Sequence, residues 1–296
     1  MTRATGEGGG PATGEGGTLY VVATPIGNLG DITLRALDVL RAVPLIAAED
    51  TRVTRKLLDR FEIAVRTTSY HAQSGPARVR ELLRHLASGA DLALVTDAGT
   101  PAVSDPGDGL AAAWAAEGGT VVAIPGASAV LTAIAATGIA GPRWSFEGFL
   151  PRSGRERKDR LAAIAADERG SILFEAPGRT EETLRDLAAA CGADRVGAVC
   201  RELTKLHETI TRGPLGELAQ AATDGTIPAR GEVVIVVGWG RGATVIEASA
   251  EDAIDALAAA RAEVERLVAA GTARGEAARR VAAATGIPRR SLYGAG

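Results

Sequence analysis

Strand-like and helix-like segments alternate along the chain from Leu19 onward, and this alternation constrains the fold more than any other feature. Short apolar runs at residues 19–23, 45–48 and 92–95 have the length and composition of buried strands. A helical pattern follows each of them in the sequence. Repeated strand–helix units place parallel strands in one sheet with helices on both faces. The sequence therefore predicts an α/β fold.

The alternation resumes after residues 141–142 and predicts a second α/β domain. Candidate strands there cover residues 144–149, 171–175, 196–200 and 232–238. The chain has 296 residues, 46% of them hydrophobic, which is enough for two packed cores. We expect four regions: a disordered tail (1–17), an N-terminal α/β domain (18–127), a C-terminal α/β domain (128–240) and a helix-turn-helix-like module (250–296).

Charge and metal-ligand content exclude several classes of protein. The net charge of -3 argues against a surface covered throughout by nucleic acid, although it permits a local basic patch. The two cysteines and three histidines lack C-x-x-C and H-E-x-x-H spacing, so we expect no zinc or other metal site. The start of the chain lacks the apolar core of a signal peptide, and we expect a cytoplasmic protein without a membrane segment.

A loop of small residues at 96–107 is the strongest candidate for ligand binding. It follows an apolar run, so it stands at the carboxyl end of a strand, where open α/β sheets bind their ligands. Its only charged groups are Asp97 and Asp105. The alternative is a rigid structural turn. We expect Asp97 to order the loop or bind the ligand, and Asp105 to cap the next helix.

The loop after the first predicted strand (24–31) lacks G-x-G-x-x-G and G-K-[ST] patterns, so it is neither a dinucleotide fingerprint nor a P-loop. A plain turn, with Asp31 capping the next helix, is the alternative to a binding loop.

Charged side chains follow several other predicted strands. Glu49, Asp50 and Arg52 suit hydrogen bonding to a polar substrate, although Asp50 or Thr51 would also serve as a helix cap. The segments after the strands of the second half are charged as well. Charge at so many strand ends favours one composite binding site.

Together and in this order, these motifs resemble the tetrapyrrole-methylase superfamily of S-adenosylmethionine-dependent methyltransferases. The resembling segments are 23–33, 47–52, 97–107, 147–151 and 201–205. The resemblance covers residues 19–237, and the helical tail fits it too. It implies two α/β domains with the cofactor in a cleft between them, no Rossmann-type cofactor site, and usually a homodimer.

The resemblance also implies the cofactor contacts and the substrate. The motifs are most similar to those of members that methylate the ribose 2′-hydroxyl of a cytidine in 16S ribosomal RNA, in the decoding region of the small ribosomal subunit. The implied contacts to S-adenosylmethionine come from Pro25, Gly27, Asp97, Gly99, Thr100, Val103, Ser104, Ala127, Ser128 and Phe174.

The transfer needs a hydroxyl oxygen held against the methyl carbon and help in removing its proton. The candidate catalytic residues are Asp50, Arg52, Glu202 and Lys205, with Glu49 as a further candidate base. Lys205 acts as a base only if its amine is neutral. We expect Asp50 and Arg52 to position the nucleotide.

Two groups of basic residues are candidates for RNA phosphate contacts, and solvated surface is the alternative for both. The first, the basic run, consists of Arg152, Arg155, Arg157, Lys158 and Arg160. The second lies in the helical module and consists of Arg274, Arg279, Arg280, Arg289 and Arg290.

Three other functions remain open at the level of sequence. Two of them are methyltransferases of the same fold, one that acts on a tetrapyrrole and one that acts on a diphthine precursor. The basic run and the helical tail weigh against both. A non-catalytic regulator would use the tail to bind nucleic acid and would bind no cofactor.

Overall fold

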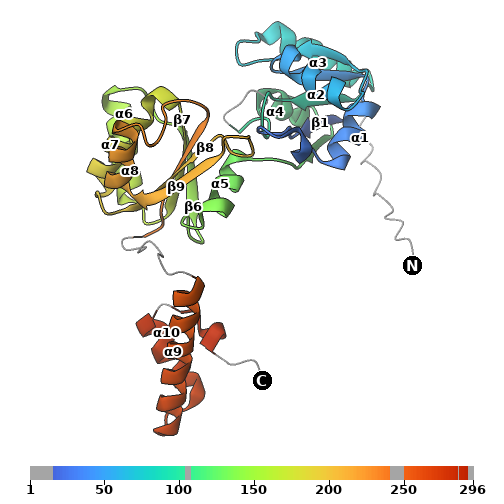
Figure 1. Cartoon of the computed structure of the whole chain (residues 1–296). Helices are drawn as coiled ribbons and strands as arrows, with labels where there is room; N and C mark the ends of the chain where they lie inside the picture. Colours follow the sequence, from blue (N-terminus) through green and yellow to red (C-terminus); the bar gives the residue numbers. More distant parts are fainter. Residues whose placement is uncertain (1–15, 104–107, 241–249, 286, 293–296) are drawn as a thin grey trace. The chain divides into compact units, whose positions relative to one another are not determined.

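The computed structural model describes residues 16–103, 108–240, 250–285 and 287–292. They form two compact units, Met1–Ala243 and Thr244–Gly296, which are described separately below (Figure 1). The first unit contains two five-stranded sheets, and the second is helical. The predicted α/β fold is thus confirmed. The predicted disordered tail lies almost wholly outside the described residues.

The first sheet is entirely parallel and has the order β3-β2-β4-β1-β5. Its central strands are short and apolar, and all four residues of β2 and of β4 are buried, as expected for a sheet covered on both faces. The strands are β1 (Leu19–Val22), β2 (Leu45–Ala48), β3 (Arg66–Ser69), β4 (Leu92–Val95) and β5 (Val121–Ile124).

Helices pack on both faces of this sheet and enclose two apolar cores. Leu40 and Leu58 lie in the core between the sheet and the helices α1 (Leu34–Ala42) and α2 (Thr51–Arg60). Leu86 and Trp114 lie in the core on the opposite face, which is covered by α3 (Pro76–Ala87) and α4 (Asp108–Ala116). Every connection is therefore a strand–helix crossover, which brings all the strand carboxyl ends to one edge.

The helix starts correct one sequence prediction. Asp31 does not cap α1; it lies in a short 3₁₀ turn, η1 (Leu29–Asp31), and the hydroxyl of Thr33 accepts the hydrogen bond from the Ala36 N–H at 3.1 Å instead. The predicted cap Asp105 lies outside the described residues.

The second sheet is mixed and has the order β6-β7-β10-β8-β9. Only β6 and β7 pair in parallel; the other three pairings are antiparallel. The sequence prediction missed β9, an edge strand. The strands are β6 (Trp144–Phe149), β7 (Gly170–Glu175), β8 (Val196–Arg201), β9 (Thr209–Pro214) and β10 (Val233–Val237).

The two faces of the second sheet are covered differently. Three helices, α6 (Gly154–Ala166), α7 (Thr180–Cys191) and α8 (Leu215–Thr223), enclose one core. A second 3₁₀ turn, η2 (Pro177–Arg179), precedes α7. The other face packs against α5 (Ala129–Thr137) and against Ile26 from the loop after β1. Ile26 thus joins the first loop of one sheet to the core of the other.

The helical unit consists of α9 (Ala250–Ala269), α10 (Arg274–Thr285) and a 3₁₀ helix, η3 (Arg289–Leu292). Val264, Val281 and Leu292 form part of its own small core. The third element, predicted to follow a turn, is a single 3₁₀ turn as far as the structure describes it. Among the described residues, no helix is both long and apolar enough to cross a bilayer.

Candidate functional site

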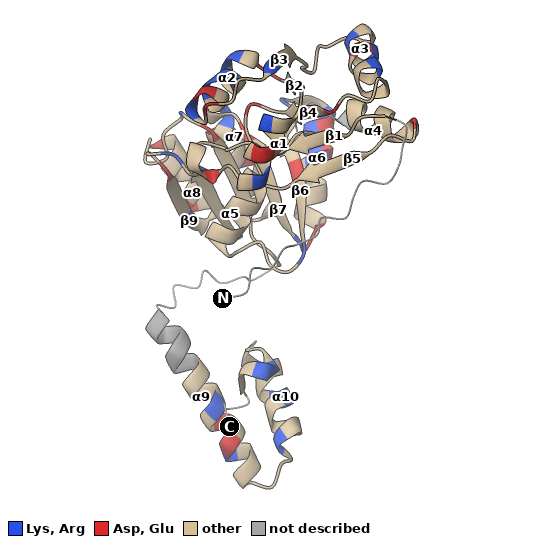
Figure 2. Ribbon diagram, turned by 90° about the vertical axis from the view of Figure 1, so that its right-hand side faces the viewer, with Lys and Arg blue, Asp and Glu red and all other residues tan. Residues whose placement is uncertain are grey.

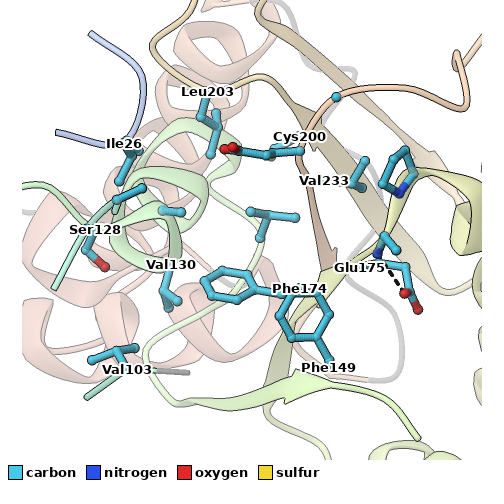
Figure 3. A pocket seen from close by; sticks show the side chains of 18 of the residues that line it. Ile26, Val103, Ser128, Val130, Phe149, Phe174, Glu175, Cys200, Leu203 and Val233 are labelled. Atoms are coloured by element: carbon cyan, nitrogen blue, oxygen red, sulfur yellow. Dashed lines mark hydrogen bonds between the residues drawn. The ribbon is translucent and has the colours of Figure 1, made fainter. Parts of the chain in front are cut away.

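A cavity of about 410 Å³ lies where the loops of both sheets meet (Figure 3). Its walls are mostly apolar side chains, and the described lining residues include two carboxylates but no lysine or arginine. The lining residues are Ile26, Ala98, Gly99, Thr100, Val103, Ser128, Ala129, Val130, Phe149, Phe174, Glu175, Ala176, Pro177, Cys200, Leu203, Gly231, Glu232, Val233 and Val234.

The predicted ligand loop forms one wall because it is tied to the loop after β1. The N–H of Thr24 donates to the carbonyl of Gly99 at 2.8 Å, and the N–H of Gly99 donates back at 3.1 Å. Gly99 has φ of +83°, a left-handed conformation that favours glycine, and Ala102, three residues later, has φ of +69°. Strained backbone of this kind is concentrated at ligand-binding sites.

The structure brings half of the predicted cofactor residues onto the cavity wall: Gly99, Thr100, Val103, Ser128 and Phe174. Ala127 lies beside the wall, since its carbonyl accepts a hydrogen bond from the Thr100 hydroxyl at 3.4 Å. Pro25, Gly27 and Asp97 also lie outside the lining. Ser104 is outside the described residues.

Sequence reasoning missed residues 231–234, which line the opposite wall. The predicted site residues follow the carboxyl ends of strands, whereas β10 runs antiparallel to its neighbours and meets the cavity with its amino end. Phe149, at the end of β6, was inside a recognised segment but was not singled out.

Asp50 caps a helix, as one of its two sequence interpretations suggested, and its role toward a substrate stays a prediction. Its carboxylate caps α2 by accepting from the Arg52 N–H at 2.8 Å, and it also forms an ion pair with the Arg52 guanidinium at 2.6 Å. The side-chain hydrogen bond from Arg52 is the main reason that the pKa of Asp50 falls to about 2. The Arg52 side chain is 88% exposed, so it is available to a polar substrate.

Asp97 lies in an acidic cluster with Glu49 and Asp50, and its carboxylate is held by a backbone hydrogen bond. Its Oδ1 accepts a hydrogen bond from the Asp50 N–H at 2.9 Å, while Glu49 accepts from the Thr96 hydroxyl at 2.6 Å. Burial first, and then the charges of Glu49 and Asp50, raise the pKa of Asp97 above its usual value.

Lys205 stands in a second charged cluster, with Glu202 at 2.9 Å and Glu232 at 3.1 Å. Burial lowers the pKa of Lys205, but the hydrogen bonds to both glutamates outweigh that effect and the pKa is raised overall. A raised pKa keeps the amine of Lys205 protonated and so disfavours Lys205 as a base. The pKa of Glu202 is lowered, chiefly by the backbone hydrogen bond from Glu232 and then by that from Lys205.

The loop that carries this cluster is tightly packed against the loop after β1. Glu202 and Thr204 have φ of +54° and +67°, and the Thr204 hydroxyl accepts from the N–H of Asn28 at 3.1 Å. A Cβ placed on Gly27 would stand 2.5 Å from Cγ of Lys205. Gly27 therefore permits a close approach between two loops of the site.

The basic run is only partly a surface feature. Arg157 is 4% exposed, and its guanidinium binds Asp186 at 2.7 Å, the carbonyl of Pro151 at 3.0 Å and the hydroxyl of Thr183 at 3.0 Å. The prediction that Arg157 contacts RNA is wrong because the side chain is engaged inside the protein. The other four residues, Arg152, Arg155, Lys158 and Arg160, are exposed.

The basic residues of the helical unit are exposed as predicted, but several form ion pairs. Arg274 binds Glu265 at 2.5 Å, and Arg279 pairs with Glu276. Arg280, Arg289 and Arg290 are exposed. Figure 2 marks Lys and Arg on both α9 and α10.

Comparison with solved structures shows a shared fold. A cobalamin biosynthetic enzyme, cobalt precorrin-4 methyltransferase, superposes with a TM-score of 0.59 at 20% identity, over 75% of this chain and 95% of that one. Uroporphyrin-III C-methyltransferase from Thermus thermophilus, solved with S-adenosylhomocysteine, gives a TM-score of 0.54 at 17% identity, over 75% and 97% of the two chains.

Sequence comparison places the chain more narrowly. Residues 18–219 match the family model of tetrapyrrole (corrin/porphyrin) methylases. A Synechocystis protein named ribosomal RNA small subunit methyltransferase I is 44% identical over 277 residues, which cover 94% of this chain and 96% of the relative. The chain therefore belongs to the ribosomal RNA small subunit methyltransferase I family within the tetrapyrrole methylases, and it is a methyltransferase of that fold.

Proposed function

We propose that the chain transfers a methyl group from S-adenosylmethionine to the ribose 2′-hydroxyl of a cytidine in 16S ribosomal RNA, in the decoding region of the small ribosomal subunit. The observation that carries the proposal is the cavity between the loop at 96–103 and the strand ends of the second sheet. The name of the Synechocystis relative supports a ribosomal RNA substrate. The proposal includes a homodimer that acts in the cytoplasm.

The cavity suits this cofactor in size and in its mostly apolar lining. Its volume of about 410 Å³ falls within the range of small-molecule sites. Glu175 and Glu232 line it, but each is already paired with a cation, Arg179 at 3.5 Å and Lys205 at 3.1 Å, so the fit of the cofactor rests on size and on the mostly apolar lining. The residues that would hold it are the ten cofactor candidates given above. When bound, S-adenosylmethionine supplies an electrophilic methyl group on a sulfonium.

The two charged clusters then hold and orient the substrate. Arg52, fixed by Asp50, presents an exposed guanidinium next to the cavity loop, and Lys205 presents an ammonium held between two glutamates. With its pKa near 2, Asp50 is a weak base, so it orients the nucleotide rather than taking the hydroxyl proton. Holding the reacting oxygen in line is itself a large part of such catalysis.

RNA phosphates bind to exposed arginines and lysines by this proposal. The contacts come from Arg152, Arg155, Lys158 and Arg160 and from the basic residues of the helical unit. Counterion release makes such binding fall steeply as salt increases. RNA affinity that is indifferent to salt would contradict both groups of contacts.

Calorimetry with S-adenosylmethionine, followed by transfer of labelled methyl groups to 16S ribosomal RNA, tests the proposal. Binding and RNA labelling are expected, whereas a non-catalytic regulator binds no cofactor and a tetrapyrrole methylase labels no RNA. The variants Asp50→Asn and Arg52→Ala should impair methylation or RNA binding. Full retention of both properties in both variants would contradict the positioning roles.

A further inference from the structure

Phe149 is an exposed aromatic ring at the cavity in a chain that is poor in aromatic residues. Only 3% of the residues are Phe, Trp or Tyr, and the chain has four phenylalanines. Phe149 lines the cavity and remains 55% exposed, whereas the neighbouring wall residues Val233 and Val234 are buried. Figure 3 shows the rings of Phe149 and Phe174 side by side on the wall. One side of the Phe149 ring is thus available to a flat partner.

The ring is held in place by aromatic packing. Phe149 meets Phe174 edge to face with 5.7 Å between the ring centroids, and Phe174 meets Phe146 in the same manner at 4.9 Å. Edge-to-face packing fixes the plane of each ring relative to the next. Phe149 is therefore oriented before any ligand arrives.

Two guanidinium groups fix the backbone directly after Phe149. Arg179 donates to the carbonyl of Leu150 at 3.0 Å, and the buried Arg157 donates to the carbonyl of Pro151 at 3.0 Å. Arg157 also binds the hydroxyl of Thr183, which donates to the buried carboxylate of Glu175 at 2.6 Å. This network joins the ends of β6 and β7, so it sets the position of both cavity-lining phenylalanines.

Exposed basic residues follow Phe149 in the sequence, and one of them, Arg155, is paired with Asp159 at 3.5 Å. Arg152 lies three residues on, and Arg155 and Lys158 lie on the first turns of α6. A stacking ring beside exposed cations is the combination by which proteins bind single-stranded nucleic acid. A cofactor that fills the enclosed part of the cavity needs no such row of cations, so charge favours RNA as the partner of this ring.

We propose that Phe149 is the stacking face for an unstacked RNA base at or next to the target nucleotide, with Arg152 and Lys158 holding the adjoining phosphates. The inference rests on the proposed function and adds the residue that receives the base. A nucleotide whose ribose is modified must leave the stacked helix, and aromatic side chains commonly receive such bases.

The test uses the full chain with a labelled 16S ribosomal RNA fragment and measures two affinities, for the RNA by fluorescence anisotropy and for S-adenosylmethionine by calorimetry. The variants are Phe149→Ala, Phe149→Leu and Phe149→Trp. Trp144→Ala is the matched control, because Trp144 is an exposed aromatic residue at the opposite end of the same strand and outside the cavity lining.

Phe149→Ala and Phe149→Leu should weaken RNA binding about 5- to 150-fold, the range for loss of one stacked base, and this loss should exceed any loss of cofactor affinity. Phe149→Trp should retain RNA affinity, and so should the control. Unchanged RNA affinity in Phe149→Ala, or a Leu variant as good as wild type, would overturn the inference. So would a loss confined to cofactor affinity, which would assign the ring to the adenine.

The wild-type chain separates this inference from the proposed function. If wild type methylates the RNA and Phe149→Ala binds it equally well, only the stacking role is wrong. If wild type neither binds nor methylates the RNA, the proposed function is contradicted and the inference with it.

Discussion

Replacing Gly27 with alanine tests the close contact between the loop after β1 and the loop that carries Lys205. The added Cβ would lie 2.5 Å from Cγ of Lys205, 2.8 Å from the hydroxyl of Thr204 and 3.0 Å from the carbonyl of Leu203. The Lys205 side chain has little freedom to move away, because its ammonium is bound to two glutamates.

The expected destabilisation follows from these contacts. Inserting a methyl group into a packed site typically costs about 1–3 kcal/mol. For a domain of this size, that corresponds to a fall in the thermal midpoint of roughly 2–12 °C. The displaced loop should also lose the hydrogen bond between Asn28 and Thr204, so affinity for S-adenosylmethionine should fall as well.

Thermal unfolding and calorimetry would be compared with those of a matched variant, Gly75→Ala. A Cβ on Gly75 meets no atom within 4 Å, so that variant reports the general effect of replacing glycine. If Gly27→Ala unfolded at the same temperature as Gly75→Ala and bound the cofactor as tightly as wild type, the proposed packing of the two loops would be refuted.

Three further predictions concern individual side chains. Arg157→Ala should lower the free energy of unfolding by about 2–4 kcal/mol, which is less than for a fully enclosed ion pair because Asp186 is partly exposed. The control Lys158→Ala should change the free energy of unfolding by less than about 0.5 kcal/mol, and urea denaturation of both variants measures the difference. The pKa of Asp167 is lowered from 3.8 to about 2, chiefly by the hydrogen bond from the side chain of Arg169, so its stabilising contribution is complete above the unfolded value and disappears as the pH falls toward 2. The stability difference between wild type and Asp167→Asn, measured by thermal melts across this range, should shrink on acidification, and a difference that grew would contradict the assignment. Burial raises the pKa of Cys200 to about 11 and also raises that of Cys191. Ellman's reagent should therefore label the native protein slowly at pH 8 and should label both thiols after unfolding. Rapid labelling of Cys200 in the native protein would contradict its burial.

The sequence predicted the first sheet and the loops around it because one physical pattern governs both. Short apolar strands joined by helices must run parallel, and parallel strands gather their carboxyl-end loops at one edge. Thr100 and Val103 were assigned to the site on the strength of the family resemblance, and the edge geometry explains why they meet Ser128 there.

Strand direction in the second sheet was harder to predict. β9 contains Gly213 and Pro214 and lies at an edge, where strands need little apolar character. β8 pairs antiparallel with both β9 and β10, so β10 runs opposite to the direction expected for a parallel sheet. Residues 231–234 therefore reach the cavity at the amino end of a strand, where the strand-end rule predicts no binding residues.

Arg157 and Lys205 show where a charge pattern misleads. Arg157 shares a helix face with the buried Leu161 and Ile164, at spacings of four and seven residues, so the helical period places it inside although its sequence neighbours are exposed cations. The charge state of Lys205 depends on Glu232, which is remote in sequence and becomes a partner only in the folded sheet.

The central claim is methyl transfer to a ribose of 16S ribosomal RNA, and the most direct measurement is to locate the methyl group. Immature small ribosomal subunits are incubated with the chain and methyl-labelled S-adenosylmethionine, and the RNA is digested and analysed by mass spectrometry. We predict label on the 2′-oxygen of a single cytidine in the decoding region. Label on a base, label in another RNA, or no label with a cofactor-binding chain would contradict the account.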